Sequence, residues 1–446
     1  HSGTNVNSTG SISLGYQAGN SSQGIYNVAI GYEAGYSSQG NYSVAIGQGA
    51  GKLNSQGVAS VAIGNIAGNN NQGDTAVAIG NSSGATNQGN LSIAIGNDAG
   101  TDNQDTRSVA IGYNAGKYDQ GSYAVAIGDN AGTGNDGTGQ GNYSVAIGTN
   151  AGAVNQSQYS VAIGHNAGYL NGQGLASVAI GNVAGQNNQG DTAIAIGNSS
   201  GATNQGNLSI AIGNDAGTDN QDTRSVAIGY NAGKYDQGSY AVAIGDNAGT
   251  GNDGTGQGNN AVAIGTNAGA VNQGSTSVAI GINAGNNSQG QYSVAIGNVA
   301  GQLNGQGLAS VAVGNMAGHN NQGGFAVAVG NGASHLNQGQ WSVGIGSDAG
   351  TENQGYSSVA IGTSAGKYEQ GIRAVAIGQS AGEGPDNVGQ GDYAIGIGYL
   401  AGYQSQHDNS IVLNASGSAL NSDGTSRLYV KPIRSVTNSN KLLYNS

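Results

Sequence analysis

A short phrase recurs along almost the whole chain at a nearly fixed interval. At residues 144–152 it reads Ser-Val-Ala-Ile-Gly-Thr-Asn-Ala-Gly, and the glycine that ends its apolar run recurs 24 times between Gly15 and Gly398. The interval is almost always 16 residues, with a few intervals of 17 and three of 20. So strict a period predicts stacked repeats, in which each unit contacts its neighbours and added length adds coils rather than a larger core.

The composition departs from that of an ordinary enzyme. The 446 residues include 86 Gly, no Cys and only 8% charged residues. Disorder is the alternative for so glycine-rich a chain, but the regular Val and Ile positions argue against it. The net charge of −12 would repel a phosphate backbone, which excludes nucleic acid as an expected partner. No run of 18 apolar residues exists, so we expect no membrane insertion.

Each copy of the phrase predicts a short strand. In the copy at residues 145–148, Val145 and Ile147 alternate with Ala146, and Gly148 ends the run. Alternate side chains of a strand point to opposite faces, so the bulky pair shares one face and the small residue takes the other. A β-branched run this short is typical of a strand rather than a helix. The second half of each copy predicts a turn, a second short extended leg and another turn.

A glutamine stands shortly before the next strand in every copy. Where the interval lengthens to 17 or 20 residues, this glutamine keeps its distance to the following strand. Its amide offers two donors and two acceptors, so equivalent residues about 4.8 Å apart can form a hydrogen-bonded ladder along the stack. The ladder is represented by Gln39, Gln72, Gln156, Gln273 and Gln354.

The period divides the chain into three parts. Residues 1–10 form a polar lead-in, residues 11–402 the repeat rod, and residues 403–446 a non-repeating β module that we expect to cap the last coil. Residues 53–156 recur almost verbatim at 170–273, an offset of seven copies. Each 20-residue interval holds a four-residue insertion, and insertions in stacked repeats leave the stack as loops. The three loops carry Asn135 and Asp136, Asn252 and Asp253, and Glu383 and Asp386.

A single chain is not expected to bury all of its apolar surface. A strand that is apolar on both faces is normally covered by other protein on both. The second leg of each coil carries small residues and can cover only the Ala face. The Val/Ile face would remain as an apolar stripe on the order of 115 Å long. At about 1.5 kcal/mol per buried Val or Ile, its burial contributes on the order of 3 kcal/mol per coil. Cyclic association of identical chains would close this face, which makes Val145, Ile147, Val262 and Ile264 predicted core residues of a homo-oligomer.

The phrase Ser-Val-Ala-Ile-Gly-x-x-Ala-Gly resembles the head repeat of trimeric autotransporter adhesins over residues 11–402. The resemblance implies an all-β fold in which three chains each wind a left-handed parallel β-roll, here of about 24 coils. It implies an extracellular location on a virion or cell surface.

The end of the chain is similar to a second family. Residues 409–417, Asn-Ser-Ile-Val-Leu-Asn-Ala-Ser-Gly, and the runs at 429–434 and 442–445 resemble the segment before the self-cleaving endosialidase-type chaperone. Such segments occur in fibre proteins of phages and large DNA viruses. The resemblance implies a chaperone that assembled the trimer, with Ser446 near the cut.

The usual signatures of catalysis and metal binding are not expected here. The Gly-x-Gly patterns do not open a helix after a strand, as phosphate binding requires. The five His residues are not at ligand spacing, and Ser, Asp and His form no constellation. Acids on the turns are interpreted as solvated. We therefore predict no enzymatic activity, no metal and no cofactor.

Aromatic residues are the candidate contact points. Many of the 22 Tyr stand five residues before the strand glycine, a register also used by Trp341. They suit corner packing between coils, and they also suit amphipathic contacts with sugars or protein receptors. The candidates are Tyr42, Tyr143, Tyr159, Tyr292 and Trp341, together with the six loop residues given above.

One expected function and two alternatives follow from these features. The first is a trimeric surface fibre in adhesion or receptor binding, which we expect on a virion, with a cell-surface glycan or protein as partner. The alternatives are a structural filament or spacer that contacts no receptor and the head domain of a bacterial trimeric adhesin.

Overall fold

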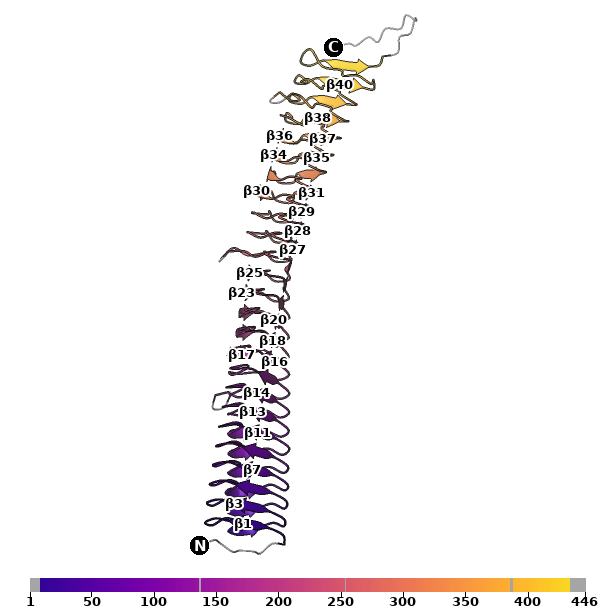
Figure 1. Ribbon diagram of the computed structural model, residues 1–446. Coiled ribbons are helices and arrows are strands. Elements are labelled where there is room, and N and C mark those ends of the chain that lie inside the picture. The colour runs from indigo at the N-terminus through magenta and orange to yellow at the C-terminus, as the bar shows by residue number, and fades with distance from the viewer. Residues whose placement is uncertain (1–8, 136–137, 253, 386–387, 434–446) are drawn as a thin grey trace, which may run out of the picture. The chain divides into compact units, whose positions relative to one another are not determined.

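The computed structural model describes residues 9–135, 138–252, 254–385 and 388–433. The chain divides into two units, His1–Asn259 and Asn260–Ser446. Each unit is a parallel β-solenoid whose coils are stacked one on the next (Figure 1). With about 26 turns in all, the stacked repeats expected from the period and the all-β parallel solenoid implied by the resemblance are confirmed.

Each regular coil contributes one apolar strand, and many coils add a second short strand that ends at the recurring glutamine. We call these second strands the glutamine strands. The apolar strands of the first unit are β1 (Ile12–Leu14), β3 (Val28–Ile30), β5 (Val44–Ile46), β7 (Val61–Ile63), β9 (Val77–Ile79), β11 (Ile93–Ile95), β13 (Val109–Ile111), β14 (Val125–Ile127), β15 (Val145–Ile147), β16 (Val161–Ile163), β18 (Val178–Ile180), β20 (Ile194–Ile196), β22 (Ile210–Ile212), β24 (Val226–Ile228) and β26 (Val242–Ile244). Its glutamine strands are β2 (Ser21–Gln23), β4 (Ser37–Gln39), β6 (Leu53–Gln56), β8 (Asn70–Gln72), β10 (Thr86–Gln88), β12 (Asp102–Gln104), β17 (Leu170–Gln173), β19 (Asn187–Gln189), β21 (Thr203–Gln205), β23 (Asp219–Gln221) and β25 (Tyr235–Gln237).

The second unit repeats this arrangement. Its apolar strands are β27 (Val262–Ile264), β28 (Val278–Ile280), β29 (Val294–Ile296), β31 (Val311–Val313), β33 (Val327–Val329), β35 (Val343–Ile345), β37 (Val359–Ile361), β38 (Val375–Ile377), β39 (Ile395–Ile397), β40 (Ile411–Asn414) and β41 (Leu428–Lys431). Its glutamine strands are β30 (Leu303–Gln306), β32 (Asn320–Gln322), β34 (Leu336–Gln338) and β36 (Glu352–Gln354).

Neighbouring apolar strands pair in parallel with identical positions side by side. Val145 of β15 lies beside Val161 of β16, and Ile147 lies beside Ile163. The glycine after each strand is fixed by the same close stacking. Gly148 has a φ of 124°, and a Cβ there would lie 2.6 Å from the carbonyl oxygen of Gly164. Only glycine fits this column, which explains why it marks the period.

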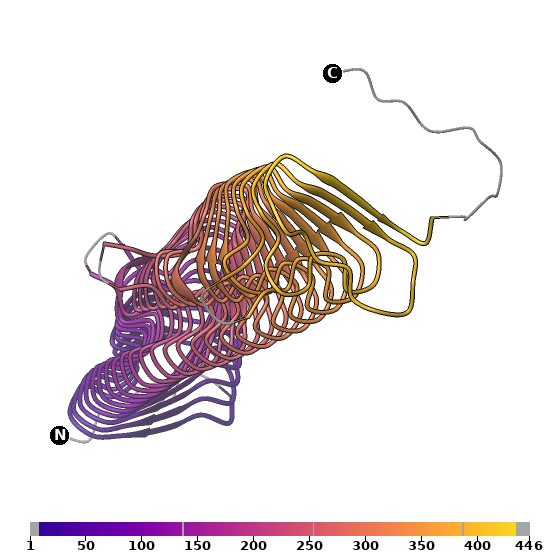
Figure 2. The ribbon, with the colours of Figure 1, turned by 90° about the horizontal axis from the view of Figure 1, so that it is seen from above.

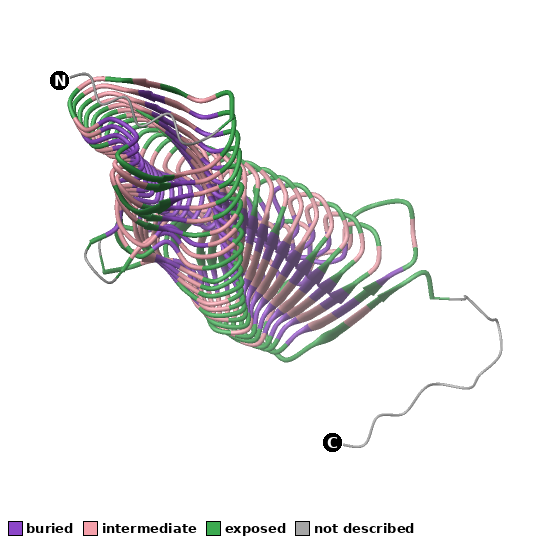
Figure 3. Ribbon diagram, turned by 90° about the horizontal axis from the view of Figure 1, so that it is seen from below, coloured by how far each residue is buried: buried purple, intermediate pink, exposed green. Residues whose placement is uncertain are grey.

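The interior of each coil is filled by small residues and by the glutamine. Ala146 of the strand and Ala151 of the following turn are fully buried, as is the strand alanine of the regular copies. Figure 3 shows buried residues forming continuous stripes from coil to coil, flanked by residues of intermediate exposure. The two faces of the apolar strand therefore differ as the alternation predicts: alanine points inward, whereas valine and isoleucine point outward.

The residues after the last regular copy continue the same sheet. Strand β40 pairs in parallel with β39, and β41 pairs in parallel with β40. Buried Val412 joins the alanine core of the preceding coils. The described part of the module expected at 403–446 thus adds two further turns beyond the 24 copies. The run at 442–445 lies outside the described residues, as does the lead-in up to residue 8.

Candidate functional site

The recurring glutamines lie inside the coils and hold the two legs together. The side chain of Gln156 is 2% exposed. Its Nε2 donates to the carbonyl oxygen of Val145 in the same coil at 2.8 Å and to Oε1 of Gln173 in the next coil at 3.2 Å. The glycine that nearly every copy carries in the preceding turn makes room for it, because a Cβ on Gly152 would lie 2.6 Å from Oε1 of Gln156.

The same bonds recur at the other glutamines chosen from the sequence. Gln72, Gln273 and Gln354 donate to the glutamine of the next coil at 3.1, 3.1 and 3.2 Å. Gln39 donates instead to the carbonyl oxygens of Val28 and Ser43. The ladder is interrupted, because Oε1 of Gln72, Gln156 and Gln273 accepts no hydrogen bond among the described residues. These glutamines are structural, and a ligand cannot reach them from outside.

The outward face of the apolar strands remains partly open to solvent. Ile147 and Ile264 are each 36% exposed, and Val145 and Val262 are of intermediate exposure. Neighbours in the stack therefore already cover most of each side chain. The remaining burial corresponds to about 0.5–1 kcal/mol per isoleucine, so the gain from a partner is on the order of 1 kcal/mol per coil. The expected 3 kcal/mol per coil is too large for this reason.

The candidate aromatic residues form exposed columns along the stack. Tyr42, Tyr143, Tyr159, Tyr292 and Trp341 are between 47% and 59% exposed. The ring of Tyr143 stacks between Tyr123 and Tyr159, with centroid distances of 4.8 and 5.4 Å. Trp341 lies 6.1 Å from Phe325 and meets Tyr356 edge-on at 5.1 Å. Stacking covers the ring faces and leaves the ring edges exposed, so these columns offer little flat surface to a sugar.

These aromatic residues also adopt an unusual backbone conformation. Tyr143 has a φ of 56° and Trp341 a φ of 57°, in the left-handed region that bulky residues seldom enter. The same register holds Arg107, whose guanidinium lies 5.3 Å from the ring of Tyr123. Stacking and cation–π contacts with neighbouring coils offset the cost of this conformation.

Each of the three insertions has a glycine that packs closely against the backbone of the preceding coil. In the second, a Cβ on Gly256 would lie 2.0 Å from the carbonyl oxygen of Asp236, and Asn252 and Thr255 form an antiparallel bridge. Asn135 and Thr138 form the equivalent bridge in the first. Asn135 and Asn252 are exposed, and Glu383 is of intermediate exposure. Asp136, Asp253 and Asp386 lie outside the described residues.

An acid holds the second insertion in place, a role that the sequence interpretation missed. Asp236 accepts from Nδ2 of Asn220 at 3.0 Å and from the backbone amide of Gly254 at 2.7 Å. It ends a row of exposed asparagines in which Asn204 donates to Asn220 at 3.0 Å. Equivalent rows end at Asp119 and Glu369. The sequence does carry a signal for this role, because the repeat position that otherwise holds mostly Asn holds an acid just before each insertion.

Beside each of the first two insertions lies a polar hollow on the outer face of the glutamine strands. The first has a volume of about 660 Å³ and the second about 640 Å³. The first is lined by Thr86, Asn87, Asp102, Asn103, Tyr118 and Asp119, with Asn135 of the insertion at its edge. The second repeats these residues at an offset of 117, for example Asp219 for Asp102. We call them the insertion hollows.

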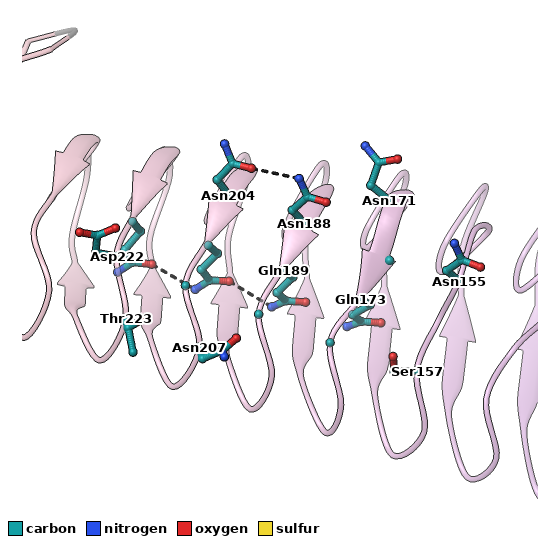
Figure 4. Close-up of a pocket in the computed structure, with 16 residues that line it drawn as sticks. Asn155, Ser157, Asn171, Gln173, Asn188, Gln189, Asn204, Asn207, Asp222 and Thr223 are labelled. Atoms are coloured by element: carbon teal, nitrogen blue, oxygen red, sulfur yellow. Dashed lines mark hydrogen bonds between the residues drawn. The ribbon is translucent and has the colours of Figure 1, made fainter.

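A shallower groove runs along the other side of the asparagine row (Figure 4). Its volume is about 560 Å³. One rim carries Asn171, Asn188 and Asn204, and the opposite rim carries Asn207 and Thr223. Its floor includes Gly190, where a Cβ would lie 2.6 Å from the next coil's backbone nitrogen. The groove is open and carries little that would fix a ligand's orientation.

Charged side chains on the coils pair locally. Nζ of Lys52 lies 2.6 Å from a carboxylate oxygen of Glu33, and this hydrogen bond raises the pKa of Lys52. The rings of His319 and His335 stack 4.9 Å apart. Burial lowers the pKa of His319, and the neighbouring His335 lowers it further. Within the described ranges, no cluster of three or more His, Asp or Glu residues is arranged to hold a metal ion.

Comparison with known families identifies part of the stack. A family model that describes two copies of the YadA head domain repeat matches residues 88–115, 140–167 and 205–232. The chain therefore carries adhesin-like head repeats on a β-solenoid. No curated protein and no solved structure matches the chain. The matched segments contain the apolar strands β11, β13, β15, β16, β22 and β24 with their following turns.

The described residues form no helix long and apolar enough to cross a membrane. The match to the YadA head repeat suggests a surface-exposed location.

Proposed function

We propose that the chain acts as a homotrimeric surface fibre in adhesion or receptor binding on a virion. The observation that carries this proposal is the outward row of valine and isoleucine, partly exposed on coil after coil. Single exposed apolar residues are common, but a continuous row of this length is typical of an interaction surface. The YadA-type head repeats in three segments support self-association of the same kind.

In such a trimer, the surfaces outside the valine and isoleucine row face solvent. Three copies around an axis along the valine and isoleucine row leave the glutamine strands, the aromatic columns and the insertions facing solvent. In Figure 2, seen along the stack of the first unit, the coil is a flattened loop with its two legs back to back.

The virion assignment rests on the resemblance of residues 409–417 to the segment before a viral fibre chaperone. The head of a cell-surface adhesin is the second candidate, favoured by the head-repeat matches. We also propose that the chain catalyses no reaction, because its Ser, Asp and His residues form no catalytic constellation in the sequence.

An adhesion assay tests this function. Purified, fluorescently labelled protein is added to candidate host cells, and bound fluorescence is measured before and after competition with unlabelled protein. Saturable, competed binding supports an adhesive fibre. Assembly into trimers without saturable binding to any cell type would point to a spacer instead.

A further inference from the structure

We infer that the two insertion hollows bind a neutral saccharide; this inference rests on the proposed adhesive function. Both hollows lie in the first unit, on the outer face of the glutamine strands, and both are bounded by an insertion. Volumes of about 660 and 640 Å³ suit a ligand of a few sugar rings. The face is opposite to the valine and isoleucine row, so trimer formation leaves it open.

Each hollow presents a carboxylate that no protein group uses. In the described parts of the chain, no hydrogen bond or ion pair engages the side chain of Asp102 or of its repeat Asp219. The nearby lysines bind elsewhere: Nζ of Lys234 lies 3.4 Å from Asp215. A free carboxylate has two oxygens that accept from adjacent hydroxyl groups, which is the pattern that a sugar diol supplies.

The exposed asparagine row that lines the hollow adds donors and acceptors at fixed positions. Asn87 donates to Asn103 at 2.9 Å, and Asn103 donates to Asp119 at 3.0 Å. Each of these bonds uses one N–H of an amide that has two, and one lone pair of an oxygen that has two. Asn103 therefore keeps one N–H and one lone pair for a ligand, and the ladder holds its side chain in place.

The hollow does not suit an extended peptide or an anionic sugar. Strand β12 is paired on one side with β10 and bridged on the other to Tyr118, so no strand edge is open for a peptide to join. Two carboxylates line each hollow and the chain has a net charge of −12, which disfavours sialylated or sulfated ligands. A neutral, hydroxyl-rich ligand remains.

Because the hollow occurs twice along the stack, it suits a ligand that is present in many copies on one surface. Asp102 and Asp219 are 117 residues apart, which is seven coils, or about 34 Å at 4.8 Å per coil. A glycan-coated surface offers many equivalent groups, so weak binding at each hollow becomes tight attachment through avidity.

A glycan array with matched variants tests the inference. The full chain is compared with Asp102→Asn/Asp219→Asn, which removes both charges at constant shape. The control is Asp74→Asn/Asp191→Asn, a pair of exposed acids that the repeat likewise duplicates; each accepts a hydrogen bond from a backbone amide at 2.8 Å, which an Asn oxygen can still accept. We expect wild-type protein and control to bind neutral glycans, and the hollow variant to bind them at least about tenfold more weakly.

A second variant blocks the hollow by volume. Thr86→Leu/Thr203→Leu places leucine where the third insertion's neighbourhood already carries Leu336, so the fold should accept it. We expect this variant to lose neutral-glycan binding with unchanged circular dichroism. Equal binding by wild type and both hollow variants would overturn the inference.

The outcomes separate this site from the proposed function. If cells are still bound by the hollow variants as by wild type, adhesion stands and the saccharide site falls. If no cell is bound by any form, the adhesive function itself fails. Binding that concentrated NaCl or polylysine abolishes would show a cationic protein partner and would also overturn the saccharide assignment.

Discussion

Nε2 of Gln205 lies 2.8 Å from the carbonyl oxygen of Ile194, across the width of its own coil. The same amide donates to Gln221 of the next coil at 3.1 Å, and its oxygen accepts from Gln189 at 3.2 Å. One buried side chain therefore joins the two legs of a coil and three successive coils. A solenoid whose interior is mostly alanine gains its internal order from these amides.

Removing one of these amides should destabilise the stack. Gln205→Ala removes the donor to the carbonyl oxygen of Ile194 and to Oε1 of Gln221, removes the acceptor for Nε2 of Gln189, and opens a cavity, at a cost of about 2–3 kcal/mol. Native-state hydrogen exchange of the surrounding coils measures the loss. The exposed Gln291→Ala is the control, for which a change below about 0.5 kcal/mol is expected. Similar effects of the two substitutions would contradict the role of the ladder.

The valine and isoleucine row should not tolerate a charge. Ile147→Asp and Ile264→Asp put a carboxylate into the proposed trimer interface, where burial without a partner is costly. We expect both variants to lose the trimer in size-exclusion chromatography with light scattering. Thr203→Asp, on the opposite face of the coil, is the control and should assemble normally. Trimers of unchanged stability for Ile147→Asp would remove this row from the interface.

The second insertion should depend on the acid at its base. Asp236→Ala removes the acceptor for the amide of Gly254 and for Asn220. Limited proteolysis should then cleave within residues 249–256 several-fold faster than in wild type. Asp246→Ala, in the turn after β26, provides the matched comparison. An unchanged cleavage rate in Asp236→Ala would show that the glycine base alone holds the loop.

Acid should weaken the coils around the stacked histidines. Burial and the neighbouring His335 hold the pKa of His319 below its usual 6.5. The unfolded chain therefore binds a proton more readily than the folded one, so stability is complete above about pH 6.5 and falls as the pH drops below it. The hydrogen-exchange rates of residues 311–345 should be equal in wild type and in His319→Gln near neutral pH. Below it, wild type should exchange faster.

His165→Gln serves as the control for the acid effect, because His165 is exposed and its Nδ1 contacts only Asn182. An acid-induced increase in exchange that persists unchanged in His319→Gln would contradict the assignment to the stacked pair.

The regular parts of the fold were predictable because they depend on local alternation. Val145, Ala146 and Ile147 divide between two faces by the geometry of a strand alone. The exposed fraction of Ile147 was not predictable in this way, because the neighbouring coils cover much of it. A β module after residue 402 was expected, but its parallel pairing into the same sheet through β40 and β41 was not predictable, because those strands pair by backbone bonds although the repeat phrase has ended.

The insertion hollows were beyond sequence reasoning for a different reason. Asp102, Tyr118 and Asn135 belong to three successive coils, and only the stacking register brings them to one place. The aromatic candidates were recognised by their register, but the stacking that covers the faces of Tyr143 depends on the distance between coils.

Sedimentation equilibrium of the full chain at neutral pH tests the central claim most directly. The account predicts a single species of three times the chain mass that persists on dilution, because the outward valine and isoleucine rows of three copies cover one another. A well-ordered species of one chain mass, with the circular dichroism of a β-solenoid, would contradict it.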